Sequence, residues 1–225
     1  RQVVDLAGQY LAPGLIDGHY HLESSMLHVD QYARAVVPHG TLAAITDLHE
    51  VTNVCGLAGM RYILECSRRV PMDMYFVAPS CVPATHLETS GAKLGPKDIS
   101  AALKWKGVLG LGEMMNFPGV INGDSETLAK IAAVGDRVKD GHAPRVTGRA
   151  LNAYMAPLIG SDHETTERHE GLEKLRRGMR LMIREGSAEK NLEDLLPLVT
   201  DGNYHRCMLV VDDRNAKDIY YDGDV

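Results

Sequence analysis

The chain is poor in cysteine and lacks a long apolar run. Among its 225 residues, four cysteines lie far apart and none forms a Cys-x-x-Cys pair, which excludes a zinc knuckle and a dithiol redox motif. Isolated cysteines are typical of reduced thiols, so we expect a cytoplasmic protein. No stretch of about 18 apolar residues is present, and residues 1–5 show no signal-peptide pattern, so no membrane segment is expected.

A basic excess and a glycine-rich phosphate loop are also missing. The formal net charge is −6, which argues against a nucleic-acid partner. Gly110-Leu111-Gly112 lacks the third glycine of a dinucleotide-binding fingerprint. Because no low-complexity segment or long linker interrupts the chain, its length suits one large α/β domain.

Short apolar runs alternate with polar segments of helical character. Eight runs are candidate strands, and they are residues 15–21, 42–50, 73–81, 107–113, 137–144, 158–164, 180–186 and 206–213. The clearest helical segments between them are residues 57–69, 96–104, 125–134, 167–177 and 188–199. Alternating strands and helices predict a parallel sheet covered by helices, and eight repeats favour a closed (β/α)₈ barrel over an open sheet.

The first run ends in two histidines, His19 and His21. Side chains at i and i+2 of a strand point the same way, about 6–7 Å apart along the strand. The pair is therefore placed to share a metal ion, although two exposed strand histidines would give the same pattern.

Ionisable residues also end five other runs. They are Asp47, His49 and Glu50; Glu113; His142; Asp162, His163 and Glu164; and Asp212 and Asp213. The C-terminal ends of barrel strands converge on one mouth, so these side chains are predicted to meet in a metal-binding cup.

The residue types in this cup suit Mn, Fe or Zn ions. We expect His19 and His21 to hold one ion, His142 and His163 a second, and Glu113 to bridge them. Two such ions activate water for hydrolytic attack on an sp² carbon. Asp212 is expected to ligate a metal and to act as general base and then general acid. The bond cleaved would belong to an amide, a cyclic imide or an exocyclic amine.

Several segments together resemble one enzyme family. Residues 13–21, Pro-Gly-Leu-Ile-Asp-Gly-His-Tyr-His, are similar to the first-strand signature of the amidohydrolase superfamily, and residues 22–27, Leu-Glu-Ser-Ser-Met-Leu, resemble its adenine deaminases. Further matches lie at residues 37–41, 47–50, 110–116, 140–144, 161–164, 182–188 and 212–214, in the family's order.

The resemblance implies a metal-dependent hydrolase that converts adenine to hypoxanthine and ammonia in purine metabolism. It implies Mn²⁺ or Fe²⁺ as cofactor, with Zn²⁺ less favoured, and a homo-oligomer. Glu113 would replace the carboxylated lysine of other superfamily members, and Asp212 would be the metal-binding proton shuttle. Asp213 would face the purine, and Asn116 would line the pocket. Three roles remain open for Glu23, His49 and Glu50. They could contact the substrate, bind a further metal, or support the metal ligands.

The chain also departs from the family pattern. Arg145 stands where the family has Gly, Leu48 replaces a Pro, and a Pro expected soon after Leu27 is missing. We expect Arg145 to narrow or charge the mouth of the cup. Residues 1–12 are expected to contain the last strand of a β-sandwich domain, at residues 3–11, and residues 13–225 to form a barrel truncated after strand 8, without its eighth helix. The chain is therefore expected to be a fragment.

Two other functions stay open at this point. One is hydrolysis of a cyclic amide, as in hydantoinase-like or dihydroorotase-like enzymes, although Glu113 and residues 23–25 argue against it. The other is a metal-binding fragment without catalytic activity.

Overall fold

A computed structural model describes residues 3–225, and their architecture is set by eight short strands. The strands are β1 (Leu15–Tyr20), β2 (Thr41–Asp47), β3 (Asp73–Ala78), β4 (Val108–Met114), β5 (Val138–Gly141), β6 (Ser161–Asp162), β7 (Arg180–Arg184) and β8 (Cys207–Val210). All eight correspond to predicted runs, six of which extended two or three residues into the loops that follow. β4 is buried at six of its seven positions, as expected for a parallel strand covered on both faces.

The strands pair in sequence order and in parallel, β1 to β5 in one sheet and β6 to β8 in another. Hydrogen bonds join the two sheets at both seams. Gly160 N–H donates to the Lys139 carbonyl (3.1 Å) beside β5, and Asp212 N–H donates to the His19 carbonyl (3.1 Å) of β1. His21 N–H returns a bond to the Asp212 carbonyl (3.0 Å). The ring is thus closed, which confirms the predicted (β/α)₈ barrel.

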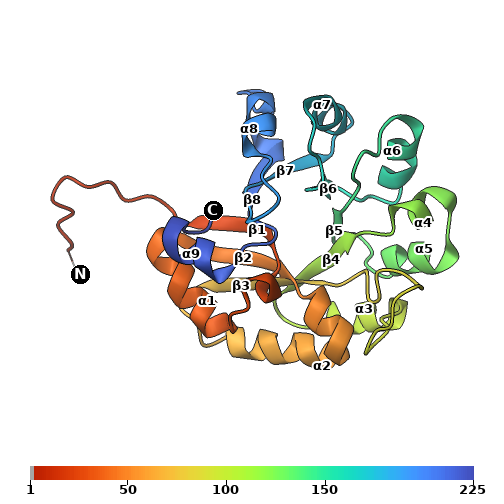
Figure 1. The fold of residues 1–225 in the computed structure, drawn as a ribbon, viewed down its shortest axis with the longest axis horizontal. Helices are drawn as coiled ribbons and strands as arrows, with labels where there is room; N and C mark the ends of the chain where they lie inside the picture. The colour runs from red at the N-terminus through yellow and green to blue at the C-terminus, as the bar shows by residue number, and fades with distance from the viewer. Residues whose placement is uncertain (1–2) are drawn as a thin grey trace.

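Helices surround the strands on the outside (Figure 1). They are α1 (Val29–Val36), α2 (His49–Ser67), α3 (Pro96–Ala102), α4 (Phe117–Asn122), α5 (Ser125–Ala132), α6 (Gly148–Met155), α7 (Arg168–Arg176), α8 (Leu192–Leu195) and α9 (Ala216–Asp222). Short 3₁₀ turns lie at Leu22–Ser25, Val37–His39, Leu196–Leu198 and Tyr204–Arg206. No helix of residues 3–225 combines the length and hydropathy required to cross a membrane.

Three helices differ from their prediction. α2 begins at His49 rather than residue 57 and is kinked at Gly56, whereas α8 is shorter than residues 188–199. The expected absence of a helix after β8 is wrong, because α9 follows it and buries Ile219 against the core beside α1. Its sequence signal is Asn215, whose side chain accepts a hydrogen bond from Asp218 N–H (3.0 Å) as an N-cap.

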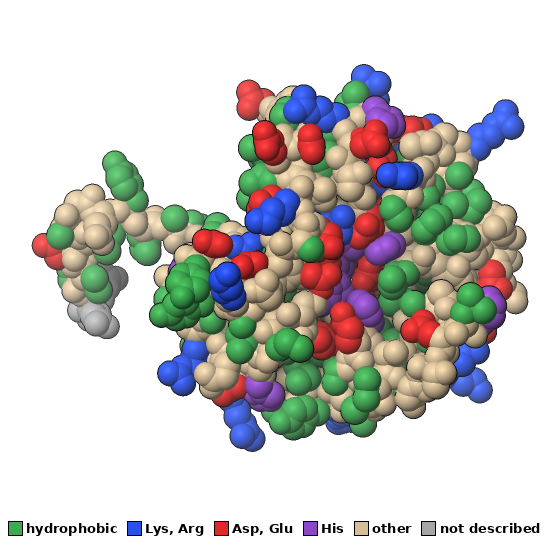
Figure 2. Space-filling model, in the orientation of Figure 1, with side chains coloured by type: hydrophobic (Ala, Val, Ile, Leu, Met, Phe, Trp, Pro, Cys, Tyr) green, Lys and Arg blue, Asp and Glu red, His purple; other side chains and the backbone are tan. Residues whose placement is uncertain are grey.

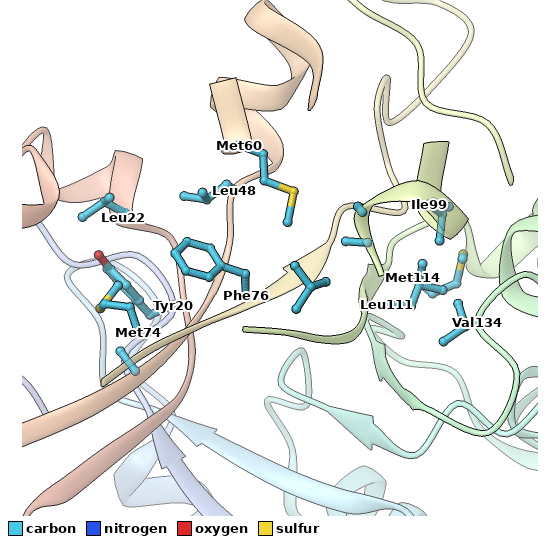
Figure 3. Close-up of a cluster of buried hydrophobic side chains, with 14 of the residues drawn as sticks. Tyr20, Leu22, Leu48, Met60, Met74, Phe76, Ile99, Leu111, Met114 and Val134 are labelled. Atoms are coloured by element: carbon cyan, nitrogen blue, oxygen red, sulfur yellow. The ribbon is translucent and has the colours of Figure 1, made fainter. Parts of the chain in front are cut away.

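The main core lies between β1–β4 and the helices outside them. Figure 3 shows Phe76 of β3 close to Leu48, which directly precedes α2, and to Met60 of α2, with Ile99 and Leu111 farther along the same layer. Each of these side chains is at most 1% exposed. This packing fixes the outer face of the strands and leaves their C-terminal ends free for polar side chains.

The strand expected at residues 3–11 is not formed. Residues 3–14 run away from the barrel without strand pairing, and Tyr10 is 100% exposed (Figure 1). A strand needs a hydrogen-bonded neighbour, and none is present for this segment among residues 3–225. The assignment of residues 1–12 to a sandwich domain stays a prediction, and residues 1–2 lie outside the described part.

Gly110 allows β4 and β5 to approach closely. A Cβ at this position would lie 2.0 Å from the Val138 carbonyl oxygen. Gly110→Ala is therefore expected to lower the free energy of unfolding by about 3 kcal/mol, the upper end of typical overpacking costs. Urea unfolding measures this loss, with Gly202→Ala in an open turn as the control. A loss within about 0.5 kcal/mol, the usual range for surface substitutions, would contradict the close approach of β4 and β5 at Gly110.

Candidate metal centre

A hollow at the C-terminal mouth of the barrel collects acidic and histidine side chains. Figure 2 shows these side chains gathered at the centre of this face. The cavity has a volume of about 210 Å³. Its lining residues are His21, His49, Glu50, Glu113, Met115, His142, His163, Glu164, Arg184, Glu189, Asp212 and Asp213.

His19 in β1 and His21, which directly follows β1, are held by their Nδ1 atoms. His19 Nδ1 lies 2.7 Å from Asp140 Oδ2, and His21 Nδ1 lies 2.8 Å from the Asp47 carbonyl oxygen. These acceptors favour the tautomer with hydrogen on Nδ1. Both Nε2 lone pairs then face the cup, where the two Nε2 atoms lie 3.2 Å apart.

Glu113, at the end of β4, occupies the centre of the cluster. Its Oε2 lies 2.5 Å from His142 Nδ1 and 3.2 Å from His163 Nε2, while Oε1 lies 3.1 Å from His49 Nε2 and 3.4 Å from His21 Nε2. Burial opposes ionisation, but these hydrogen bonds outweigh it and hold the pKa of Glu113 well below its usual range. A carboxylate with each oxygen facing different histidines has the geometry of a bridging ligand.

Asp212, two residues after the end of β8, approaches His21 and His19. Its Oδ1 lies 3.1 Å from His21 Nε2 and 3.6 Å from His19 Nε2. Its Oδ2 accepts a hydrogen bond from Arg184 Nη1 (2.7 Å). Although burial raises the pKa of Asp212, its close contacts with His19 and His21 dominate and lower it. The side chain is therefore a charged acceptor in the folded state.

Asp47 at the end of β2, His49 at the start of α2 and Glu23 after β1 have shifted pKa values. Burial raises the pKa of Asp47 to about 6. Burial lowers the pKa of His49, but its hydrogen bond to Glu113 and the charge of Asp47 outweigh this and raise it to about 9. Burial, together with the nearby Glu50 carboxylate, raises the pKa of Glu23 to about 7. This side of the cup thus packs acids closely enough to disfavour full ionisation.

The six predicted metal ligands lie together at the mouth of the barrel. Of the predicted substrate-binding residues, some line the cup and others do not. His49, Glu50 and Asp213 line the cup, and Asp213 accepts a hydrogen bond from the Ser24 hydroxyl. Glu23 is not part of the lining, because its Oε1 accepts a hydrogen bond from Val51 N–H (3.1 Å) near the start of α2.

The expectation that Asn116 lines this cup is wrong. Its Oδ1 accepts a hydrogen bond from Gly119 N–H (3.0 Å), and its Nδ2 donates to Thr127 (2.8 Å). Asn116 is the N-cap of α4, so both ends of its amide are engaged outside the cup.

Arg145 also stays outside the cup. It is exposed, absent from the lining, and has φ of 58°, a left-handed conformation that glycine adopts without strain. The glycine of the family pattern is therefore explained by the backbone, and the expectation that Arg145 narrows the mouth is wrong.

Three contributors were missed by the sequence reasoning. Asp140 precedes His142 by two residues on β5, so the i, i+2 rule that selected His19 and His21 would have found it. Arg184 ends β7 and forms ion pairs with Glu164 (2.5 Å) and Asp212 (2.7 Å), so the strand-end rule would have found it. Glu189 has no comparable signal, because it lies in the loop after β7.

The donor set fits metal ions. Groups of three potential ligand atoms lie within 4.8 Å of one another, among them His19, His21 and Glu113, and also Glu113, His142 and His163. Imidazole and carboxylate donors suit first-row transition metals. The Nδ1 partners of His19 and His21 are the indirect contacts that commonly orient metal-bound histidines.

Comparison with known proteins identifies similar chains. A family model described as "Amidohydrolase family" matches residues 10–218. The chain is 57% identical over 225 residues to an adenine deaminase of Dehalococcoides mccartyi strain CBDB1, covering 100% of this chain and 39% of the relative. Identity to adenine deaminase 2 of Carboxydothermus hydrogenoformans is 50% over 221 residues, covering 98% and 39%. For an adenine deaminase of Kosmotoga olearia it is 46% over 228 residues, covering 100% and 40%. The chain thus spans about two-fifths of the length of these curated relatives.

Proposed function

This chain belongs to the amidohydrolase family, and from that premise we propose that it is the barrel of an adenine deaminase. The observation that carries the proposal is the position of Glu113, an unmodified carboxylate surrounded by His21, His49, His142 and His163. The similarity to curated adenine deaminases over the whole chain supports adenine as the substrate.

Six residues would hold two Mn²⁺ or Fe²⁺ ions, with Zn²⁺ less favoured. They are His19, His21, Glu113, His142, His163 and Asp212. When bound, such ions supply Lewis-acid activation of water. Five of these side chains are buried and His142 is partly buried, which strengthens their electrostatic interactions within the cup.

Asp212 would move the proton that the reaction requires. Adenine and water give hypoxanthine and ammonia: water supplies the oxygen of the new C6 carbonyl, the C6–N bond breaks, and the amino group leaves as ammonia. Oδ1 of Asp212 faces His21 and Oδ2 is held by Arg184, so the carboxylate is fixed where it would carry the proton between water and the leaving group. Asp213 would accept a hydrogen bond from the purine ring, held in place by the Ser24 hydroxyl.

The remaining lining residues suit a small base that offers several hydrogen-bond donors. Glu50, Glu164 and Glu189 add acceptors around a cavity of about 210 Å³, and Arg184 is the one Lys or Arg among its lining residues. We also propose a cytoplasmic homo-oligomer that binds neither nucleic acid nor membrane. The four free cysteines are consistent with a reducing compartment.

A direct assay tests this proposal. The purified chain is loaded with Mn²⁺ or Fe²⁺, incubated with adenine, and followed by purine absorbance and ammonia release. We expect hypoxanthine and ammonia in equal amounts. Turnover of hydantoin or dihydroorotate without turnover of adenine would contradict the substrate, and two bound ions without turnover of any of the three would contradict catalysis.

A further inference from the structure

A fully buried lysine lies behind the cup and takes no part in the proposed chemistry. Lys174 of α7 is 0% exposed. Its Nζ donates hydrogen bonds to Glu170 Oε1 (2.6 Å), Asp162 Oδ2 (2.8 Å), Thr165 Oγ1 (3.0 Å) and the Ala143 carbonyl (2.8 Å). We call Lys174, Asp162, Thr165 and Glu170 the Lys174 cluster. A buried ammonium is tolerated when it is paired and hydrogen-bonded in this way.

The Lys174 cluster grips the backbone that carries His142. Ala143 follows His142 directly, and its N–H donates to Asp162 Oδ1 (2.8 Å) while its carbonyl accepts from Lys174. Arg145 N–H donates to Glu170 Oε1 (2.8 Å). Three hydrogen bonds therefore fix the turn after β5 to the cluster.

The same cluster holds the backbone that carries His163. Asp162 is the residue before His163, and burial opposes its ionisation, but the Lys174 charge dominates and lowers its pKa. Thr165, two residues after His163, donates its hydroxyl to Asp162 Oδ2 (2.7 Å). The cluster thus holds the chain on both sides of His163.

His163 is held differently from His19 and His21. His19 and His21 are anchored through their rings, by Asp140 and the Asp47 carbonyl. His163 Nδ1 is buried and has no hydrogen-bond partner among residues 3–225. Apart from its contacts with Glu113 and the stacked His19 ring, the His163 ring is oriented by its backbone.

We propose that Lys174 is a positioning residue for the His142–His163 half of the metal centre. The inference rests on the two-metal function proposed above. Lys174 neutralises two buried carboxylates that clamp the turns after β5 and β6, so that both imidazoles reach Glu113. The His19–His21 half does not hydrogen-bond to the cluster and should be insensitive to it.

Lys174→Met tests this inference through metal binding. Loss of an indirect partner typically weakens metal affinity by about 10–100-fold, and we expect this loss for the second Mn²⁺ only. Calorimetric titration measures the two affinities. Electron paramagnetic resonance distinguishes a coupled Mn²⁺ pair, expected for the unmodified chain, from the isolated ion expected for the variant.

Two further variants control for a general loss of structure. Lys139→Met removes another buried lysine, whose Nζ donates to the Gly135 carbonyl (2.6 Å), and should keep both ions. If Lys174→Met does not fold, Glu170→Gln retains the lysine and the shape of the cluster, and should weaken the second ion by a smaller factor. Two ions bound with unchanged affinities, or an equal loss of both, would overturn the role of Lys174. Failure of the unmodified chain to bind two ions would instead contradict the proposed function, and the inference with it.

Discussion

Glu113→Gln is expected to remove the metal pair and the deaminase activity together. Glutamine keeps the shape of the side chain but cannot offer two anionic oxygens to His142, His163, His49 and His21 at once. Because indirect partners already change metal affinity by about 10–100-fold, loss of the central carboxylate should exceed the upper end of that range. Metal analysis after dialysis and the adenine assay are the two measurements.

A surface glutamate provides the matched control for this substitution. Glu126 is exposed and forms an ion pair with Lys93, so Glu126→Gln should retain both ions and full turnover. If Glu113→Gln held two ions as tightly as the unmodified chain, Glu113 would not be the bridging ligand.

Asp212→Asn is expected to lower kcat by about 10²–10⁴-fold, the usual contribution of a general acid–base group. Much of the bound metal should remain, because the amide oxygen still faces His21. Asp212 has φ of 58°, a conformation that asparagine tolerates better than most residues, so the backbone should not change. The adenine assay and metal analysis separate the two effects.

Asp201→Asn, at an exposed position, is the control and should behave as the unmodified chain. Unchanged kcat in Asp212→Asn would remove Asp212 from the proton-transfer role. Loss of both ions would show that its main contribution is ligation.

The sequence predicted the barrel well because each strand has a clear apolar run. Its strand boundaries were less accurate. The run at residues 158–164 reduces to a two-residue β6, since Leu158 adopts a left-handed φ of 70° and the strand pairs with β7 only at Ser161 and Asp162. Periodicity reports burial, whereas hydrogen-bonded pairing depends on the neighbouring strand.

The accuracy of the site prediction also depended on where each residue lies in the fold. The proposed metal ligands could be selected from the sequence because they occupy strand ends, whose direction the barrel fixes. Asn116 also follows a strand, but it caps α4, and an asparagine at a strand–helix junction is compatible with either role. The Lys174 cluster could not be predicted, because the apolar pattern does not show that Lys174 of α7 contacts Asp162 of β6 and the turn at Ala143.

The seam between β8 and β1 has a consequence for how the chain folds. There, Asp17 Oδ1 accepts a hydrogen bond from Val211 N–H, a residue 194 positions away, and Asp212 bonds to the backbone of His19 and His21. Contacts of such sequence separation form slowly. The cup therefore forms only after residues 211–212 have met residues 17–21, and an ion that binds only the closed ring would shift the equilibrium toward that late step.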